Sequence, residues 1–436
     1  MFYKLITFGC QMNISDSERI TTVLKKMKYQ PTLDEKKADL ILINSCSVRQ
    51  NAINRIFGQE RKWRKLKKLN PLLIIALTGC ITEKDKKNFK NKVDLIFDIK
   101  ELPNLKSLLN SCSDDHQSLA KRDKINLTGH ALLNNYLTSP DLVQQISSNR
   151  SHKTKQNSKQ HYLHIKPIYS NKTIAYVPIM TGCDNFCSYC VVPYTRGREI
   201  SRPFEKILKE IKNLIKKKYK EICLLGQNVN SYFSKSQTKN FIVRANNHSL
   251  QNKIINFPKL LEKINNLSGE FQISFFTSHP KDMSDELIDT MAECKKIKKE
   301  LHLPIQSGDD EILKKMNRKY TVENYLKLVQ KIRKKIKKIF LSTDIIVGFP
   351  GETKKQFENT VKLCKKIKFN KAYISQYSPR PGTLAAKLND DISKEEKKRR
   401  WKILDDLINK KNAKINKIFK KKFCKKQNVK FYCRGE

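Results

Sequence analysis

Short apolar runs alternate with amphipathic helical patterns from residue 175 onward, and this alternation constrains the fold more than any other feature. The runs have the length of β-strands and occupy residues 175–180, 221–225, 271–276, 300–304, 340–347 and 371–375. The clearest helical patterns occupy residues 203–218, 285–293, 322–336 and 354–367. Apolar strands that alternate with helices form parallel sheets covered by helices. Six such units are fewer than the eight of a complete barrel, so the sequence predicts a partial (β/α)6 barrel.

The turn after the first of these runs holds three cysteines with the spacing C-x3-C-x2-C, at Cys183, Cys187 and Cys190. Thiolates are the usual ligands of iron–sulfur cubes. A closed zinc site needs four protein ligands, and an electron-carrying cube needs four cysteines. Three cysteines leave one iron open to a small molecule. The alternative is a zinc site that borrows a distant ligand from His152, His161 or His164.

The N-terminal region repeats one pattern three times, in which an apolar run is followed by a small residue and a cysteine. The repeats occupy residues 4–10, 38–46 and 72–80, and a fourth run at 93–97 lacks the cysteine. Helical patterns lie between them: one starts near Ser15, with Glu18 at capping-box spacing, and another occupies residues 51–69. This order predicts an N-terminal α/β domain with a parallel sheet.

The three repeats place Cys10, Cys46 and Cys80 at the carboxyl ends of successive strands. Ligands bind beyond those ends in sheets of this kind, so the fold is expected to bring the cysteines together. Three converging thiolates predict a second iron–sulfur cluster with one open iron. The alternative is three unrelated buried cysteines, because free cysteine is a common core residue.

Polar, glycine-containing turns follow the later strands of the predicted barrel. They include Gly226-Gln227-Asn228, Thr277-Ser278-His279-Pro280, Ile305-Gln306-Ser307-Gly308 and Gly348-Phe349-Pro350-Gly351-Glu352. Each turn alone could be an ordinary surface turn. Their recurrence at one rim of a barrel favours binding of the amino-acid and ribose parts of a cofactor.

Composition changes divide the chain into five segments. The predicted order is an N-terminal α/β domain (1–110), a polar linker (111–168) with a short helix at 131–137, the barrel (169–385), a basic helical segment (386–422) and a short strand-like end (423–436). Residues 234–256 show no periodicity and are expected to form an inserted loop.

The formal net charge is +47, from 89 Lys and Arg residues against 42 Asp and Glu residues. Such a charge favours binding of polyanions such as RNA. The excess is mostly lysine in a sequence rich in Ile and Asn, so a drift in genome composition is a competing explanation. No apolar run approaches the length of a membrane span, and no signal-peptide pattern is seen at the N-terminus. The twelve cysteines are therefore expected in a reducing compartment, and the protein in the cytoplasm.

These motifs together resemble the methylthiotransferases, a radical S-adenosylmethionine (SAM) family, over nearly the whole chain from Tyr3 to about Leu407. The segments that carry the resemblance are Phe8-Gly-Cys-Gln-Met-Asn13, Val191-Val-Pro-Tyr-Thr-Arg-Gly197, Leu224-Leu-Gly-Gln-Asn-Val229, His302-Leu-Pro-Ile-Gln-Ser-Gly308 and Asp344-Ile-Ile-Val-Gly-Phe-Pro-Gly-Glu-Thr353. Within the family, the sequence is most similar to members that act on N6-dimethylallyladenosine in tRNA.

The resemblance implies an enzyme with two [4Fe-4S] clusters. The cluster on Cys183, Cys187 and Cys190 would bind SAM and cleave it to a 5′-deoxyadenosyl radical, which takes hydrogen from C2 of the adenine next to the anticodon. The cluster on Cys10, Cys46 and Cys80 would carry the sulfur that a second SAM methylates. The side chains expected to contact SAM are Tyr189, Gln227, Asn228, Ser278, Gln306 and Ser307. The expected partners are the tRNA and a reductant protein such as flavodoxin or ferredoxin, and the chain is expected to be a monomer without membrane association.

Other functions stay open at this point. A methylthiotransferase that acts on threonylcarbamoyladenosine in tRNA or on a ribosomal protein is the nearest alternative, and a non-catalytic iron–sulfur or zinc RNA-binding protein is a distant one. The family usually ends in a small β-barrel, the TRAM domain, of which residues 423–436 resemble only a remnant. We therefore expect tRNA binding to depend on phosphate contacts and to weaken steeply with salt.

Overall fold

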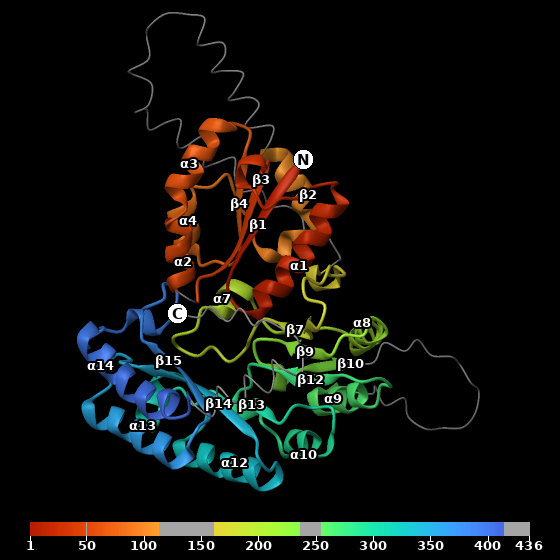
Figure 1. Cartoon of the computed structure of the whole chain (residues 1–436). Coiled ribbons are helices and arrows are strands. Elements are labelled where there is room, and N and C mark those ends of the chain that lie inside the picture. Colours follow the sequence, from red (N-terminus) through yellow and green to blue (C-terminus); the bar gives the residue numbers. More distant parts are fainter. Residues whose placement is uncertain (49, 113–160, 236–253, 414–436) are drawn as a thin grey trace, which may run out of the picture. The chain divides into compact units, whose positions relative to one another are not determined.

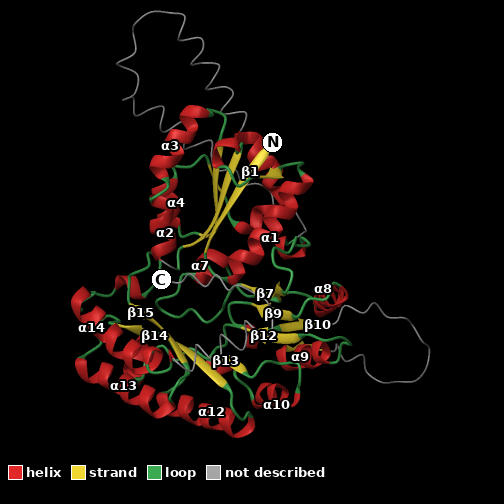
Figure 2. Cartoon of the chain, in the orientation of Figure 1, coloured by secondary structure: helices red, strands yellow, loops and turns green. Residues whose placement is uncertain are grey.

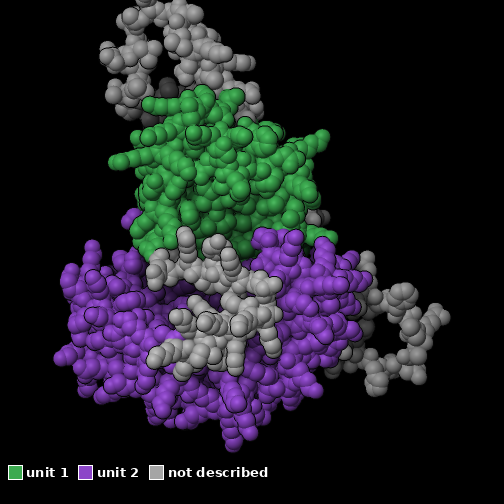
Figure 3. Space-filling view, viewed as in Figure 1, with its two compact units in different colours: residues 1–81, 85–168 green, residues 82–84, 169–436 purple. Residues whose placement is uncertain are grey.

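A computed structural model describes residues 1–48, 50–112, 161–235 and 254–413. The chain divides into two compact units, which are described separately (Figure 3). Unit 1 contains residues 1–81 and 85–168, and unit 2 contains residues 82–84 and 169–436. The expected helix at 131–137, most of the inserted loop and the strand-like end at 423–436 lie outside the described residues.

Unit 1 is built on a five-stranded parallel sheet with the order β2-β1-β3-β4-β5, which confirms the predicted α/β domain. Its strands are β1 (Phe2–Phe8), β2 (Gln30–Pro31), β3 (Leu40–Cys46), β4 (Ile74–Cys80) and β5 (Leu95–Ile96). Every residue of β3 and β4 is buried. Helices cover both faces of the sheet, and this explains why the central strands are continuously apolar (Figure 1). The helices are α1 (Gln11–Lys26), α2 (Gln50–Phe57), α3 (Glu60–Leu69) and α4 (Glu83–Phe89).

Two helix predictions for unit 1 are wrong in detail. Helix α1 begins four residues before Ser15, because Cys10 is its N-cap and the Asn13 side chain accepts a hydrogen bond from the Cys10 backbone N–H at 3.2 Å. Ser15 lies inside the helix, where its hydroxyl accepts a hydrogen bond from Arg19 at 2.7 Å. The single helix expected at 51–69 is two helices, α2 and α3, which are separated by a turn at Gly58, a poor helix former.

Unit 2 contains two three-stranded parallel sheets with the orders β12-β9-β6 and β13-β14-β15. Their strands are β6 (Ile174–Pro178), β9 (Glu221–Leu225), β12 (Gln272–Phe275), β13 (Glu300–His302), β14 (Phe340–Val347) and β15 (Lys371–Gln376). An isolated parallel bridge joins Ile273 of β12 to Ile297, in the segment that leads into β13, so the six strands follow one another in chain order. This arrangement confirms the predicted partial barrel.

Helices surround the six strands on the outside (Figures 1 and 2). They are α8 (Phe204–Lys216), α9 (Phe257–Asn265), α10 (Asp285–Glu293), α12 (Val322–Lys335), α13 (Lys354–Ile367) and α14 (Lys394–Leu404). Two shorter helices, α7 (Val192–Arg196) and α11 (Asp310–Lys315), lie in the segments after Cys190 and after β13. Two antiparallel pairs complete the unit: β7 (Met180–Thr181) with β8 (Ile200–Ser201), and β10 (Phe233–Lys235) with β11 (Ile254–Asn256).

Short 3-10 helices occur in both units. They lie at Glu35–Lys37, Ile99–Asn104, Tyr162–His164, Val229–Ser231, Pro280–Asp282 and Ala385–Lys387, and a π-helix lies at Asp405–Lys410.

The basic helix α14 packs against the last strand of the barrel. The Trp401 indole N–H donates to the Ile374 carbonyl at 3.0 Å, and Asn409 exchanges hydrogen bonds of 2.8 and 3.0 Å with the backbone of Ala372. These contacts cover the outer edge of β15, which would otherwise present unpaired backbone groups. Lys397 and Arg400 are each only 4% exposed, so these two cations of the helix are not available to an external polyanion.

A buried ion pair crosses the strand starts of unit 2, and its loss is expected to be costly. Lys298 Nζ lies 2.6 Å from Glu221 Oε2, both side chains are 7% exposed, and Glu221 Oε1 accepts from Ser274 at 2.6 Å. Lys298→Met leaves a buried carboxylate without its counter-charge, which is expected to lower the free energy of unfolding by about 3–5 kcal/mol. Urea denaturation monitored by circular dichroism measures the loss. Lys335→Met, which removes the exposed pair with Asp289, is the control and is expected to change little; equal losses would contradict the prediction.

Candidate active site

The three-cysteine loop of unit 2 lies between β7 and α7. Gly182 opens the loop with φ +83°, and a Cβ atom there would lie 2.1 Å from the Arg198 carbonyl oxygen. The Cys183 N–H donates to the Gly197 carbonyl at 3.2 Å, and the Cys190 N–H donates to the Cys187 carbonyl at 2.9 Å. The sequence therefore folds this segment into a short closed loop that carries all three cysteines, as the spacing predicts.

The segment after α11 holds this loop from the other side. The Ser188 N–H donates to the Met316 carbonyl at 3.0 Å, and the Ser188 hydroxyl donates to the Lys315 carbonyl at 2.8 Å. The Asn317 side-chain amide donates to the Phe186 carbonyl at 2.9 Å. Backbone groups on both sides of Cys187 are thus fixed by residues of a distant part of the chain.

Two polar side chains approach the cysteine sulfurs. The Asn185 amide lies 3.5 Å from Cys183 Sγ, and Arg318 Nη1 lies 3.4 Å from Cys187 Sγ. Burial raises the pKa of Cys190 to about 12, and the neighbouring Cys187 adds to the shift. Burial also raises the pKa of Cys183. Both thiols are therefore protonated near neutral pH without a metal, and a cluster that bound there would have to displace these protons.

Three of the predicted SAM-contacting residues carry buried polar atoms that have no hydrogen-bond partner within the described parts of the chain. These atoms are Asn228 Oδ1, Ser278 Oγ and Gln306 Oε1. Gln306 also has a positive φ of +70°, and Thr277, which precedes Ser278, has a positive φ of +68°. Buried unpaired polar atoms and strained backbone are concentrated where a ligand binds. The turns therefore fit a small polar cofactor.

The other three predicted contacts are already engaged in the protein. The Gln227 side-chain oxygen accepts from the Gly182 N–H at 2.7 Å, and the Ser307 hydroxyl accepts from the Asp309 N–H at 3.3 Å. Tyr189 packs against the apolar cluster of Ile312, Met316, Phe349, Tyr377 and Ala385. These side chains support the loop and the turns, and contact with SAM stays a prediction for all six.

In unit 1, the second set of cysteines lies at the carboxyl edge of the sheet. Cys46 and Cys80 end β3 and β4, are paired in register, and are both buried. Cys10 follows β1, whose Phe8 pairs with Ser45 of β3. The three cysteines therefore end neighbouring strands of one parallel sheet, as predicted. Within the described chain, no three His, Cys, Asp or Glu side chains form a group that could hold a single metal ion, so cluster ligation stays a proposal.

A buried amide network lies directly behind these cysteines. The Asn13 amide donates to Asn44 Oδ1 at 3.1 Å and to the Ser45 carbonyl at 3.2 Å. The Asn44 amide donates to the Asn13 carbonyl at 2.8 Å and to the Ser17 hydroxyl at 2.9 Å. Fully satisfied buried networks are rigid, so this one fixes the first turn of α1 against β3. The position of Cys10 relative to Cys46 follows from these bonds.

Comparison with known proteins decides the family. Residues 3–98 match the model of the Uncharacterized protein family UPF0004, and residues 177–364 match the Radical SAM superfamily. The tRNA-2-methylthio-N(6)-dimethylallyladenosine synthase of Clostridium botulinum (strain Okra / Type B1) is 40% identical over 422 residues, which cover 95% of this chain and 83% of that protein. The chain belongs to this synthase family. The synthase of Carboxydothermus hydrogenoformans is also 40% identical, over 95% of this chain and 85% of its own length.

Solved structures with the same fold include a radical S-adenosylmethionine methyltransferase, TsrM, from Kitasatospora setae. It matches 88% of this chain and 75% of its own with a TM-score of 0.55 at 12% identity. At that identity the likeness shows the fold alone. As a member of a radical SAM family, the present chain uses SAM and a [4Fe-4S] cluster. Among the described residues of the present chain, no helix is both long enough and apolar enough to cross a membrane.

Some residues of this synthase-family site were missed by sequence reasoning. Arg318 and Asn317 touch the cysteine loop, although no motif singled them out. Asn185 lies within the loop, and sequence reasoning gave it no role. The available signal was the polar stretch Asn317-Arg-Lys-Tyr320 directly after a short helix that follows a barrel turn. The alternative zinc site would need a ligand from His152, His161 or His164. His161 and His164 belong to unit 1, whereas the cysteine loop belongs to unit 2, and His161 Nδ1 already accepts a hydrogen bond from the Leu163 N–H. His152 lies outside the described residues.

If Cys10, Cys46 and Cys80 hold a cluster, Gly79→Ala is expected to remove that cluster selectively. Gly79 has φ +114°, and a Cβ atom there would lie 2.2 Å from the Ser45 carbonyl oxygen and 2.6 Å from Asn44 Oδ1. The strand end that carries Cys80 must then move, and about half of the iron is expected to be lost. Iron and sulfide analysis after anaerobic reconstitution measures this. Gly58→Ala is the control, since its nearest contact would be 3.5 Å; full iron in the Gly79 variant would contradict the prediction.

Proposed function

We propose that this chain is a tRNA methylthiotransferase, which inserts a methylthio group at C2 of N6-dimethylallyladenosine next to the anticodon. The observation that carries the proposal is 40% identity over 95% of the chain to proteins named for this reaction. Two sets of three cysteines, one in each unit, are consistent with it. The C2–H bond of an adenine is not activated toward acid–base chemistry, so this reaction calls for a radical cofactor.

The chain would hold two clusters with separate tasks. Cys183, Cys187 and Cys190 would ligate the cluster that binds SAM, and Cys10, Cys46 and Cys80 would ligate the second. When bound, a cluster with an open iron supplies the electron for SAM cleavage, or a site for the sulfur to be transferred.

In this proposal, the protein side chains bind and orient SAM. The unpaired oxygens of Asn228, Ser278 and Gln306 would accept hydrogen bonds from the amino-acid or ribose groups of SAM. Each of these three residues is at most 7% exposed, so these hydrogen bonds would form away from bulk water.

The partners follow from this chemistry. A one-electron reductant such as flavodoxin or ferredoxin would supply electrons, and we propose a cytoplasmic monomer. Threonylcarbamoyladenosine in tRNA or a ribosomal protein is the second candidate substrate. A non-catalytic iron–sulfur or zinc RNA-binding protein would release no 5′-deoxyadenosine.

Mass spectrometry of nucleosides tests the substrate. Dimethylallylated tRNA is incubated anaerobically with the reconstituted protein, SAM and a reductant, and is then digested. The expected result is the 2-methylthio derivative of N6-dimethylallyladenosine. Formation of 5′-deoxyadenosine with unchanged tRNA would reject the substrate and retain the radical chemistry, and a parallel reaction with threonylcarbamoyladenosine tRNA would then identify the alternative.

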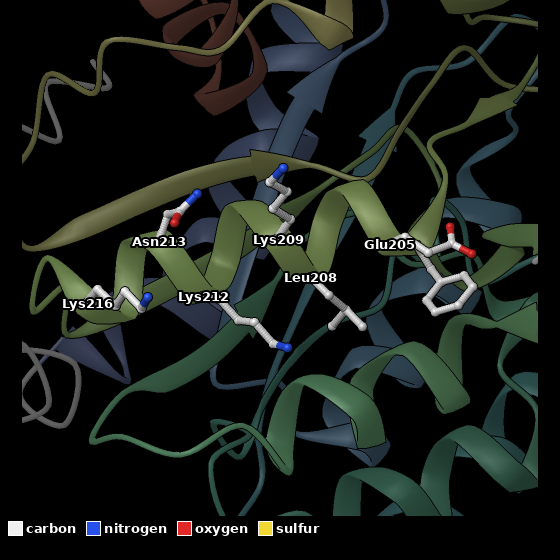
Figure 4. Close-up of a pocket in the computed structure, with 7 residues that line it drawn as sticks. Glu205, Leu208, Lys209, Lys212, Asn213 and Lys216 are labelled. Atoms are coloured by element: carbon white, nitrogen blue, oxygen red, sulfur yellow. The ribbon is translucent and has the colours of Figure 1, made fainter. Parts of the chain in front are cut away.

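A row of unpaired lysines on unit 2 is expected to contribute to tRNA binding. Lys209, Lys212 and Lys216 line a groove along α8 (Figure 4), are exposed, and form no ion pair with the residues described. Each lysine that neutralises a phosphate steepens the salt dependence of binding. Changing all three to Gln is expected to reduce the slope of log Kd against log salt by about 3.

Lysines on α12 provide the matched control for this measurement. Lys327, Lys331 and Lys335 are already paired with Glu323, Asp285 and Asp289 at 2.5 to 2.8 Å. Their replacement by Gln is expected to change the slope less than the α8 triple variant does. A shallow salt dependence of the unmodified protein, or equal slopes for both triple variants, would contradict the role of α8.

A further inference from the structure

Arg318 is a buried cation in direct contact with the cysteine loop. It is 8% exposed and donates from Nη1 to Cys187 Sγ at 3.4 Å, from Nη2 to the Pro304 carbonyl at 3.0 Å, and from Nε to the Tyr320 hydroxyl at 2.8 Å. Tyr320 is fixed in turn, since its hydroxyl lies 2.9 Å from the Ile305 carbonyl. All three nitrogens of the guanidinium are thus committed, and one of them points at a cysteine sulfur.

No carboxylate balances this charge in the part of the chain that the structure describes. Two other buried arginines of unit 2 are paired with carboxylates: Arg202 lies 2.6 Å from Glu210, and Arg400 lies 2.7 Å from Glu352. A buried cation without a counter-charge is strongly unfavourable. The missing negative charge therefore has to be supplied by whatever binds at Cys187.

We infer that Arg318 sets the reduction potential of the cluster held by Cys183, Cys187 and Cys190, and raises it. The inference rests on the proposed function, because it requires that cluster. Three thiolates give a [4Fe-4S] cluster a net negative charge in its oxidised form, and the electron from the donor adds one more. A fixed cation at the sulfur of Cys187 stabilises the more negative form preferentially, and burial strengthens the effect.

The step that Arg318 assists is the transfer of one electron from the donor protein, in which no bond forms or breaks. Radical SAM chemistry needs a strong reductant, so a higher cluster potential lets a weaker donor reduce the site. Arg318 acts through Cys187, which makes it a positioning residue rather than a catalytic one.

A redox titration followed by electron paramagnetic resonance tests the inference. The parent protein carries Cys10→Ala, Cys46→Ala and Cys80→Ala, so that only the barrel cluster is observed, and SAM is omitted. Arg318→Gln is expected to lower the midpoint potential, and Arg318→Lys is expected to lower it less because the charge is kept.

Arg198 supplies the control, since it lies just after α7, is paired at 3.0 Å with Asp184 of the cysteine loop, and its side chain is 71% exposed. Solvent screens that charge, so Arg198→Gln is expected to leave the potential close to that of the parent. Equal potentials for the parent and Arg318→Gln would overturn the inference, as would an equal shift in Arg198→Gln.

The iron content of each variant distinguishes a failure of the proposed function from a failure of the role inferred for Arg318. A parent protein that binds no cluster would reject the proposed function itself. If the parent binds a cluster and only Arg318→Gln does not, the midpoint potential is measured in Tyr320→Phe instead. That variant removes the hydroxyl that orients Arg318 and leaves the cysteines untouched. A lower potential in Tyr320→Phe supports the inference, and an unchanged one overturns it. An unchanged potential with weakened SAM binding would identify Arg318 as a ligand of the SAM carboxylate instead.

Discussion

Replacing Cys187 by Ala is expected to reduce SAM cleavage to the background rate, a loss of about 10⁶-fold or more. Cys187 lies in the middle of the loop that we propose as the cluster site, and both the adjacent Ser188 backbone and the Arg318 side chain hold it in place. Two remaining cysteines cannot retain a cube with one open iron. Release of 5′-deoxyadenosine, measured by liquid chromatography and mass spectrometry, gives the rate.

Cys294→Ala is the matched control for this variant. Cys294 belongs to the same unit, is 7% exposed and packs within the main apolar core. Its loss is expected to cost some stability and no SAM cleavage. Wild-type rates of 5′-deoxyadenosine release in Cys187→Ala would show that the loop is not the SAM site.

Replacing Cys80 by Ala is expected to separate SAM cleavage from methylthio transfer. Cys80 ends strand β4 of unit 1. The apolar core around that strand consists of unit 1 residues alone, so the barrel core is not disturbed. Formation of 5′-deoxyadenosine should persist, while the methylthio product falls by about 10³-fold or more. Both quantities are measured in the same reaction.

Cys112 offers the control in unit 1, because it is half-buried and its thiol donates to the Asp94 carbonyl at 3.8 Å, directly before β5, whereas Cys46 and Cys80 are the last residues of their strands. Cys112→Ala is expected to form the methylthio product at the normal rate. If Cys80→Ala abolished SAM cleavage as well, or reduced neither reaction, the proposed division of tasks between the two cysteine sets would be wrong.

The barrel strands were predictable because each is a buried apolar run between clear helical patterns. Glu221–Leu225 and Phe340–Val347 match the predicted runs residue for residue, as do helices Asp285–Glu293 and Lys354–Ile367. The start of α1 was misplaced because its cap is a cysteine, a residue that seldom caps helices. Local capping rules favoured Ser15, and the tertiary contact between Asn13 and Asn44 overrode them.

The candidate site was predictable where it is local in sequence. The cysteine loop and the polar turns after the strands are short motifs, and their placement at strand ends follows from the parallel topology. Arg318 was not predictable, because its contact with Cys187 joins residues 131 positions apart. The burial of Lys397 and Arg400 was missed for a similar reason. Besides the nearby Asp390 and Glu396, these side chains bond to the Tyr377 carbonyl and to Glu352, which are 20 and 48 positions away.

Transfer of a labelled hydrogen atom tests the central claim most directly. The substrate is tRNA that carries deuterium at C2 of N6-dimethylallyladenosine, and both products are analysed by mass spectrometry. We predict one deuterium atom in the 5′-deoxyadenosine that is released, together with the unlabelled 2-methylthio nucleoside. Methylthio product accompanied by 5′-deoxyadenosine without deuterium would contradict hydrogen abstraction from C2 by the radical formed at the cysteine loop.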